Sequence, residues 1–221
     1  MATFPRVRIK ICCISSLAEA RSAIRFGADA LGLVGPMPSG PGVVGDELAA
    51  QIVRATPPPI ATFMLTSETT VAGIVAHHQR VGANTIQLVD AVQPETYAQL
   101  HRLLPAVKLV QVIHVINQAN VAEALSSVEN GADALLLDSG NPMLAVKELG
   151  GTGRVHNWLI SRQIVDQSSV PVFLAGGLNP GNVREAVETV RPFGLDICSG
   201  VRTDGHLDER KLDAFITATF F

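Results

Sequence analysis

Gly27-Ala28-Asp29-Ala30-Leu31 recurs, letter for letter, as Gly131-Ala132-Asp133-Ala134-Leu135, almost half a chain later. The match extends backwards, because Ala-Glu-Ala at residues 18–20 and again at residues 122–124 precedes the two copies at the same spacing. In each copy an amphipathic stretch ends at a glycine, as helices commonly do, and an apolar run follows. The repeat therefore predicts two similar halves with equivalent helix-to-strand connections.

Short apolar runs alternate with longer amphipathic runs along the whole chain. The predicted strands are Val7–Cys12, Ala30–Val34, Ala61–Leu65, Thr85–Val89, Leu109–Val115, Ala134–Asp138, Val170–Ala175 and Leu195–Ser199. The predicted helices are Ser16–Phe26, Asp46–Ala55, Glu68–Val81, Pro94–Leu104, Val121–Asn130, His156–Asp166, Pro180–Val190 and Asp208–Thr219. Eight strands, each followed by a helix, are typical of a (βα)8 TIM barrel. We predict an α/β fold in which residues 1–221 form one such barrel with a closed, parallel, eight-stranded sheet; a doubly wound open sheet is the alternative.

Composition narrows the functional class. The chain has 221 residues, is 47% hydrophobic and 17% charged, and carries a net charge of -3. A chain of this length buries about 70% of its unfolded surface without needing disulfides. The absence of a basic run argues against a nucleic-acid partner, and no apolar stretch approaches the ~20 residues of a membrane span. Residues 1–10 also lack the apolar segment of a secretory signal. We therefore expect a cytoplasmic protein that binds neither nucleic acid nor a membrane.

The three cysteines are Cys12, Cys13 and Cys198. Neighbouring residues of a strand point to opposite faces, so Cys12 and Cys13 cannot bridge without distortion, and Cys198 is remote in sequence. No cysteine or histidine spacing is typical of zinc, so we expect neither a disulfide nor a metal site. Strand alternation places Lys10 and Cys12 inside the barrel and Cys13 among the residues that pack on the helices.

Active sites of TIM barrels lie at the carboxyl ends of the strands, where Cys12 ends the first strand. Lys10 lies about 7 Å along the same face, and its charge would favour the thiolate. Alternatively, Asp196 on the neighbouring eighth strand holds Lys10 in a structural ion pair. From this strand alone, Cys12 is either a reactive thiol or a small buried hydrophobe.

Asp138 directly follows three leucines at the end of the sixth predicted strand. A carboxylate there is costly unless it is solvated, paired or used, so Asp138 and Cys12 form a candidate acid/base pair. An ordinary capping or loop aspartate is the alternative. His114 is expected to be a satisfied residue of the barrel mouth or core, and His77 and His78 are expected to be solvated on a helix.

Glycines follow the last three strands. Gly176-Gly177 leads from the seventh strand towards a helix, and Ser199-Gly200 follows the eighth. Backbone amides at such turns approach an anion closely, and TIM barrels often bind phosphate there, so these four residues predict a phosphate site. A further cluster that includes Gly151 and Gly153 lies in the long loop after the sixth strand, as expected of a lid or binding loop.

Together these residues resemble the phosphoribosylanthranilate isomerase family of tryptophan biosynthesis. The matching elements keep the family's order and are Lys10-Ile11-Cys12, Gly27–Gly32, Gln87-Leu88, Leu136-Leu137-Asp138, Gly150–Gly153, Trp158, Leu174–Leu178, Asn182-Val183 and Ser199–Val201. The resemblance implies a ribulose-phosphate-binding barrel and an intramolecular oxidoreductase of the aldose–ketose isomerase class that needs no cofactor. It also implies that Cys12 is the general base and Asp138 the general acid of an Amadori rearrangement, with the glycine loops holding the phosphate.

The sequence also departs from the family. Cys13 replaces a glycine, Val89-Asp90 replaces His-Gly, and the loop of residues 35–42 lacks the arginine that holds the anthranilate carboxylate. Arg154 or Arg202 is a candidate substitute. The alternative is a divergent relative that acts on another phosphosugar, or a phospho-ligand binder without turnover. The expected partner is thus a small phosphorylated sugar, bound by a monomer or homodimer.

Overall fold

Pairing between the first and last long strands closes the sheet into a ring. In the computed structural model, which describes residues 6–38, 40–140 and 155–220, β1 (Arg8–Ile11) pairs in parallel with β8 (Gly194–Ile197). The strands between them are β2 (Ala30–Val34), β3 (Ala61–Thr66), β4 (Thr85–Leu88), β5 (Lys108–His114), β6 (Ala134–Asp138) and β7 (Val172–Leu174). Each strand pairs with its sequence neighbour, so the predicted closed barrel is confirmed.

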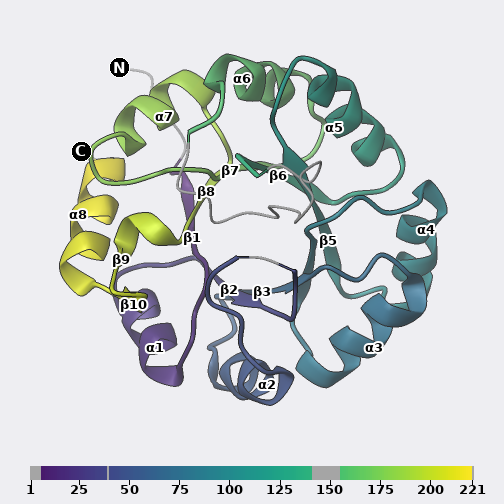
Figure 1. The fold of residues 1–221 in the computed structure, drawn as a ribbon, viewed down its shortest axis with the longest axis horizontal. Helices are drawn as coiled ribbons and strands as arrows, with labels where there is room; N and C mark the ends of the chain where they lie inside the picture. Colours follow the sequence, from purple (N-terminus) through teal and green to yellow (C-terminus); the bar gives the residue numbers. More distant parts are fainter. Residues whose placement is uncertain (1–5, 39, 141–154, 221) are drawn as a thin grey trace.

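Helices surround this ring (Figure 1). They are α1 (Leu17–Arg25), α2 (Asp46–Ala55), α3 (Val71–Val81), α4 (Pro94–Leu103), α5 (Ala119–Glu129), α6 (Trp158–Gln167), α7 (Val183–Val190) and α8 (Glu209–Phe220). All eight predicted helices are present with small differences at their ends. The sequence reading missed a 3-10 turn, η1 (Ser199–Val201), and a two-stranded hairpin of β9 (Arg202–Thr203) and β10 (His206–Leu207). No helix among the described residues is long and apolar enough to cross a membrane.

The repeated Gly-Ala-Asp segment forms the same hydrogen bond in both halves. The Oδ2 atom of Asp29 accepts a hydrogen bond from the Ile9 amide at 2.9 Å, and the Oδ2 atom of Asp133 accepts one from the Leu109 amide, also at 2.9 Å. The glycine that opens each copy is left-handed, with φ of +99° and +114°. Each aspartate therefore ties the start of its own strand to the start of the preceding strand, which explains why the short motif recurs.

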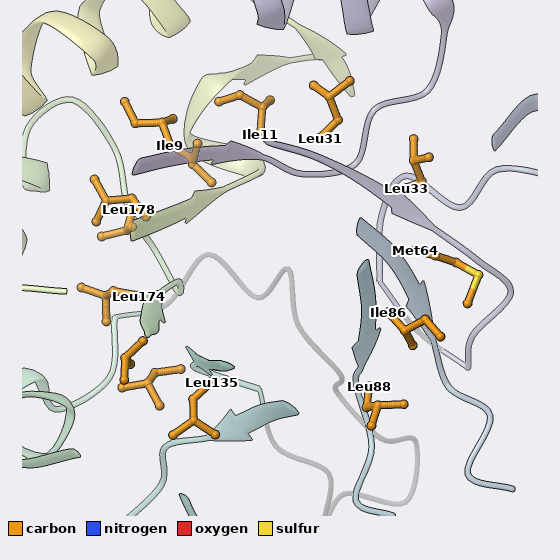
Figure 2. Packing of buried hydrophobic residues seen from close by; sticks show 14 of the residues in the cluster. Ile9, Ile11, Leu31, Leu33, Met64, Ile86, Leu88, Leu135, Leu174 and Leu178 are labelled. Carbon is orange, nitrogen blue, oxygen red and sulfur yellow. The ribbon is translucent and has the colours of Figure 1, made fainter. Parts of the chain in front are cut away.

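Two apolar clusters lie on opposite sides of the strands. The larger fills the space between strands and helices, and Figure 2 shows its side chains, among them Ile9 and Ile11 of β1, on the outer side of the ring. The smaller cluster lies inside the ring and includes Cys12 and Phe63. The strand alternation predicted for β1 is thus correct as far as Cys12.

Candidate active site

Cys12 and Lys10 face the barrel interior against Gly32 of β2. A Cβ atom placed on Gly32 would lie 2.8 Å from the Cys12 Sγ and 3.0 Å from the Lys10 Nζ. The missing side chain of Gly32 therefore makes room for both groups. Lys10 is fully buried and Cys12 is only 6% exposed.

Lys10 forms the structural ion pair with Asp196 that was the alternative to a direct role at Cys12. Its Nζ lies 2.8 Å from Oδ1 of Asp196 on β8 and 5.2 Å from the centre of the Phe63 ring. Burial by itself lowers the pKa of Lys10, but the Asp196 carboxylate and the Cys12 sulfur outweigh that effect, and the net pKa is raised. Lys10 is therefore a charged lysine whose charge is largely taken up by Asp196.

Lys10 favours the Cys12 thiolate, as expected, but burial disfavours it more strongly. Burial raises the pKa of the Cys12 thiol to about 11, with Lys10 opposing the shift and Asp196 adding to it. Desolvation wins because the lysine charge is already paired with a carboxylate. In the free protein at neutral pH, Cys12 is almost entirely a thiol.

Two expectations for Cys13, that it forms no disulfide and that it packs on the helices, are wrong. Cys13 forms a disulfide with Cys198, with Cα atoms 5.9 Å apart, and it belongs to the inner cluster. The alternation of β1 does not reach it, because β1 ends at Ile11 and Cys13 has a left-handed φ of +62°. Cys12 is the cysteine that remains free. The disulfide joins the carboxyl ends of β1 and β8 directly beside it.

Asp138 ends β6 with its side chain at the same mouth of the barrel. It is 8% exposed, and its Oδ1 accepts the Ser139 amide at 2.7 Å. Asp138 and Cys12 both interact electrostatically with Asp196, which lies on β8 between them in the ring. The sulfur and the carboxyl group therefore both lie within electrostatic range of Asp196.

His156 also lies at this site, although its only signal in the sequence is its place after the glycine cluster. Its Nε2 lies 2.6 Å from the Ser161 Oγ, and its Nδ1 is buried without a partner. A Cβ on Gly176 would lie 3.1 Å from that Nδ1. Burial lowers the pKa of His156 to about 4, with Asp138 opposing the shift. A neutral imidazole thus lies between the acid and the glycine turn.

The glycine turn after β7 has the geometry of an anion site. Gly176 and Gly177 are both left-handed, with φ of +85° and +64°. The Asn182 side chain donates to the Gly177 carbonyl at 3.0 Å, which fixes the turn. Among the described residues, the amides of Gly176, Gly177 and Ser199 have no hydrogen-bond acceptor. Those N–H groups are free to meet an anion.

Gly200 lies in η1 and packs against the same region, because a Cβ there would overlap the carbonyl oxygen of Leu178. The remaining phosphate candidates, Gly151 and Gly153, lie outside the described residues. So does Arg154.

Arg202 does not replace the missing carboxylate-binding arginine. Its guanidinium pairs with Glu19 at 3.0 Å and donates to the backbone carbonyls of Cys12 and Cys13. The side chain is only 8% exposed. Arg202 therefore holds the turn after β1 in place, a role that the sequence reading missed because Glu19 is far from it in the chain.

The expectation for His77 is wrong, and the expectation for His114 is met in part. His77 is not solvated: it is 3% exposed, and its Nδ1 lies 2.9 Å from the Thr66 Oγ1, while Gly35 packs against its ring. His114 lies at the barrel mouth as expected, but it is satisfied at one ring nitrogen and not at the other. The described residues include no group of three or more His, Cys, Asp or Glu placed to share a metal.

A cavity of about 410 Å³ opens at the opposite end of the barrel, where Arg8, Lys108 and Phe193 lie near the amino ends of the strands. It does not coincide with the predicted site. Barrel chemistry belongs to the carboxyl ends, so the candidate active site is the end that carries Cys12 and Asp138.

Comparison with known proteins identifies the family of the chain. The model of the family described as N-(5'phosphoribosyl)anthranilate (PRA) isomerase matches residues 9–218. N-(5'-phosphoribosyl)anthranilate isomerase 2 of Methanosarcina mazei is 37% identical over 95% of this chain and 92% of its own length.

Two solved structures are similar over 96% of this chain and 98% of theirs. One is a phosphoribosyl anthranilate isomerase in complex with reduced 1-(o-carboxyphenylamino)-1-deoxyribulose 5-phosphate, with 27% identity and a TM-score of 0.79. The other is of monomers of the dimeric enzyme from Thermotoga maritima, with 26% identity and a TM-score of 0.77. The chain belongs to the N-(5'-phosphoribosyl)anthranilate isomerase family.

Proposed function

We propose that this chain converts N-(5'-phosphoribosyl)anthranilate into the corresponding 1-amino-1-deoxyribulose 5-phosphate, an Amadori rearrangement, with Cys12 as base and Asp138 as acid. The observation that carries the proposal is that a free thiol and a carboxyl group lie at the same barrel mouth, on strands separated by β7 and β8. In the part of the chain that the structure describes, backbone amides in the loops after those two intervening strands have no acceptor. Family membership supports the same reaction.

The proton transfers balance without any other reactant. Asp138 donates a proton to the furanose ring oxygen, the bond from that oxygen to C1' breaks, and the amine lone pair forms a C1'=N iminium. The Cys12 thiolate then takes the proton from C2', and the electron pair of that C–H bond forms the C1'=C2' double bond of an enolamine. The enolamine tautomerises when its hydroxyl loses a proton and C1' gains one, which gives the C2' ketone.

The high pKa of Cys12 fits a base that must remove a carbon-bound proton. A thiolate with a pKa of about 11 is scarce at neutral pH but strongly basic once formed. Lys10 is close enough to stabilise that thiolate, and Asp196 keeps Lys10 from acting as a base itself.

We also propose that the phosphate of the substrate binds at the amides of Gly176, Gly177, Ser199 and Gly200. The left-handed turn after β7 and the turn η1 after β8 lie side by side, since Gly200 packs on Leu178. Two sets of amides that converge in this way suit a dianion. We propose further that the 1–221 chain acts as one barrel domain, as a monomer or homodimer, in the cytoplasm.

Direct turnover of phosphoribosylanthranilate tests the assignment. We expect Cys12→Ala and Asp138→Asn each to lower kcat by about 10²- to 10⁴-fold, the usual contribution of a general acid or base, with the thermal unfolding midpoint nearly unchanged. Asp166→Asn, an exposed carboxylate in a helix pair with Arg162, is the matched control and retains activity. Full activity in both active-site variants would refute the assigned roles.

The loop of residues 35–42 has no arginine, which favours a second candidate function, that of a relative acting on another phosphosugar. Wild-type protein that binds ribulose 5-phosphate but neither converts phosphoribosylanthranilate nor restores growth of a tryptophan auxotroph would favour that candidate. Restored growth would exclude it.

A further inference from the structure

His114 is the last residue of β5 and points into the barrel. Val112 and Val110, two and four residues earlier, belong to the inner cluster, so strand alternation places His114 on the same side. It is directly opposite Asp138 in the pairing of β5 with β6. The side chain is only 6% exposed. His114 is thus a buried imidazole next to the proposed acid.

One nitrogen of this imidazole has a partner and the other has none. Nε2 lies 3.1 Å from the carbonyl oxygen of Val89. A carbonyl only accepts hydrogen bonds, so Nε2 carries the proton and Nδ1 presents a lone pair in the neutral ring. Nδ1 is buried and has no hydrogen-bond partner. A buried acceptor without a donor is costly, and such a group at an active-site mouth indicates a ligand that brings the donor.

The order of strands around the ring indicates which donor this is. The proposed phosphate amides follow β7 and β8, so the C5' end of the sugar lies there, and the C1' end lies on the opposite side of the mouth. Asp138 on β6 serves the ring oxygen, while Cys12 on β1 serves C2'. β5 adjoins β6 on the side away from β7. His114 therefore lies in the sector between the ring oxygen and the amine on C1'.

We propose that Nδ1 of His114 accepts a hydrogen bond from the N–H group on C1' and is a substrate-recognition residue of this enzyme. The proposal rests on the proposed function, because it uses the placement of the sugar. The contact strengthens during the reaction, since the nitrogen gains positive charge when the ring opens and its N–H becomes a better donor. Loss of this hydrogen bond should therefore lower kcat as well as the affinity for the substrate.

Two substitutions separate this role from a structural one. His114→Phe removes the acceptor, whereas His114→Asn keeps a side-chain oxygen near the position of Nδ1. We expect His114→Phe to lower kcat/KM for phosphoribosylanthranilate by about 10- to 100-fold, and His114→Asn to stay within about fivefold of wild type. Urea unfolding of both variants reports any general loss of stability.

Two ligands then identify the contact. Reduced 1-(o-carboxyphenylamino)-1-deoxyribulose 5-phosphate carries the amine, whereas ribulose 5-phosphate does not. We expect His114→Phe to weaken binding of the first about tenfold or more and to leave the second unchanged. Equal weakening of both ligands, or no change in kcat/KM, would overturn the proposal. Because Cys12→Ala and Asp138→Asn test the reaction itself, failure of the His114 proposal is distinguishable from failure of the assigned function.

Discussion

The Nζ of Lys10 and the Oδ1 of Asp196 lie 2.8 Å apart in the interior of the barrel, on the two strands whose pairing closes the sheet. Their side chains are 0% and 8% exposed. Such a pair is worth little relative to apolar residues of the same shape, but removal of one partner leaves a buried, unbalanced charge.

We therefore expect Lys10→Met and Asp196→Leu each to reduce the free energy of unfolding by about 3–5 kcal/mol, and the Lys10→Met/Asp196→Leu double variant to lose less than the sum. Urea unfolding measures all three. Glu188→Gln, in an exposed helix pair with Arg184, is the control and changes stability by no more than about 0.5 kcal/mol. Strictly additive losses at Lys10 and Asp196 would show that the pair is not coupled.

The titration of Cys12 provides a second prediction. Because burial raises its pKa to about 11, thiolate forms only as the pH rises far above the ordinary cysteine value of about 8.5. The ultraviolet absorbance of the thiolate, taken as wild type minus Cys12→Ser, is expected to have its midpoint near pH 11. A midpoint at or below 8.5 would contradict the dominance of burial.

The stability of the protein in mild acid depends on His156. Its folded-state pKa is about 4, below the ordinary value near 6.5, so the unfolded chain takes up a proton that the folded protein does not. Stability from the neutral imidazole is therefore present above pH 6.5 and is lost as the pH falls towards 4. Relative to His156→Phe, we expect wild type to lose up to about 3 kcal/mol over this interval. Parallel pH–stability curves for the two proteins would contradict the buried, neutral state.

Gly176 and Gly205 form a matched pair of left-handed glycines, with φ of +85° and +78°. A Cβ at Gly205 meets nothing within 4 Å, whereas one at Gly176 lies 3.0 Å from the Ser139 Oγ. We expect Gly205→Ala to cost about 1–2 kcal/mol of stability from backbone strain alone. Gly176→Ala costs more and also weakens ribulose 5-phosphate binding by about tenfold or more, as measured by calorimetry. Equal phosphosugar affinity in both variants would remove the turn after β7 from the phosphate site.

The fold was predictable because its signals are local and repeated. Apolar runs of strand length alternate with amphipathic runs of helix length, and the Gly-Ala-Asp segments mark equivalent connections in both halves. The interior position of Cys12 followed from alternation alone. These inferences need no knowledge of which distant residues meet.

The inferences that failed depend on distant residues or on single dihedral angles. The left-handed backbone at Cys13 redirects its side chain, and no pattern in the sequence predicts a left-handed residue there. The pKa of Cys12 depends on the balance between burial and a lysine that Asp196 already neutralises. Arg202 was a plausible carboxylate ligand until its contact with Glu19, 183 residues away, was known.

The internal duplication makes the two halves chemically complementary. By the shared aspartate hydrogen bonds, the second-half counterpart of Cys12 is Val112, and by the repeated letters the first-half counterpart of Asp138 is Val34. Each proposed catalytic position in one half is thus matched by an inert valine in the other half. Under the proposed roles, the pseudo-symmetric scaffold has a polarity, with proton removal assigned to its amino-terminal half and proton delivery to its carboxyl-terminal half.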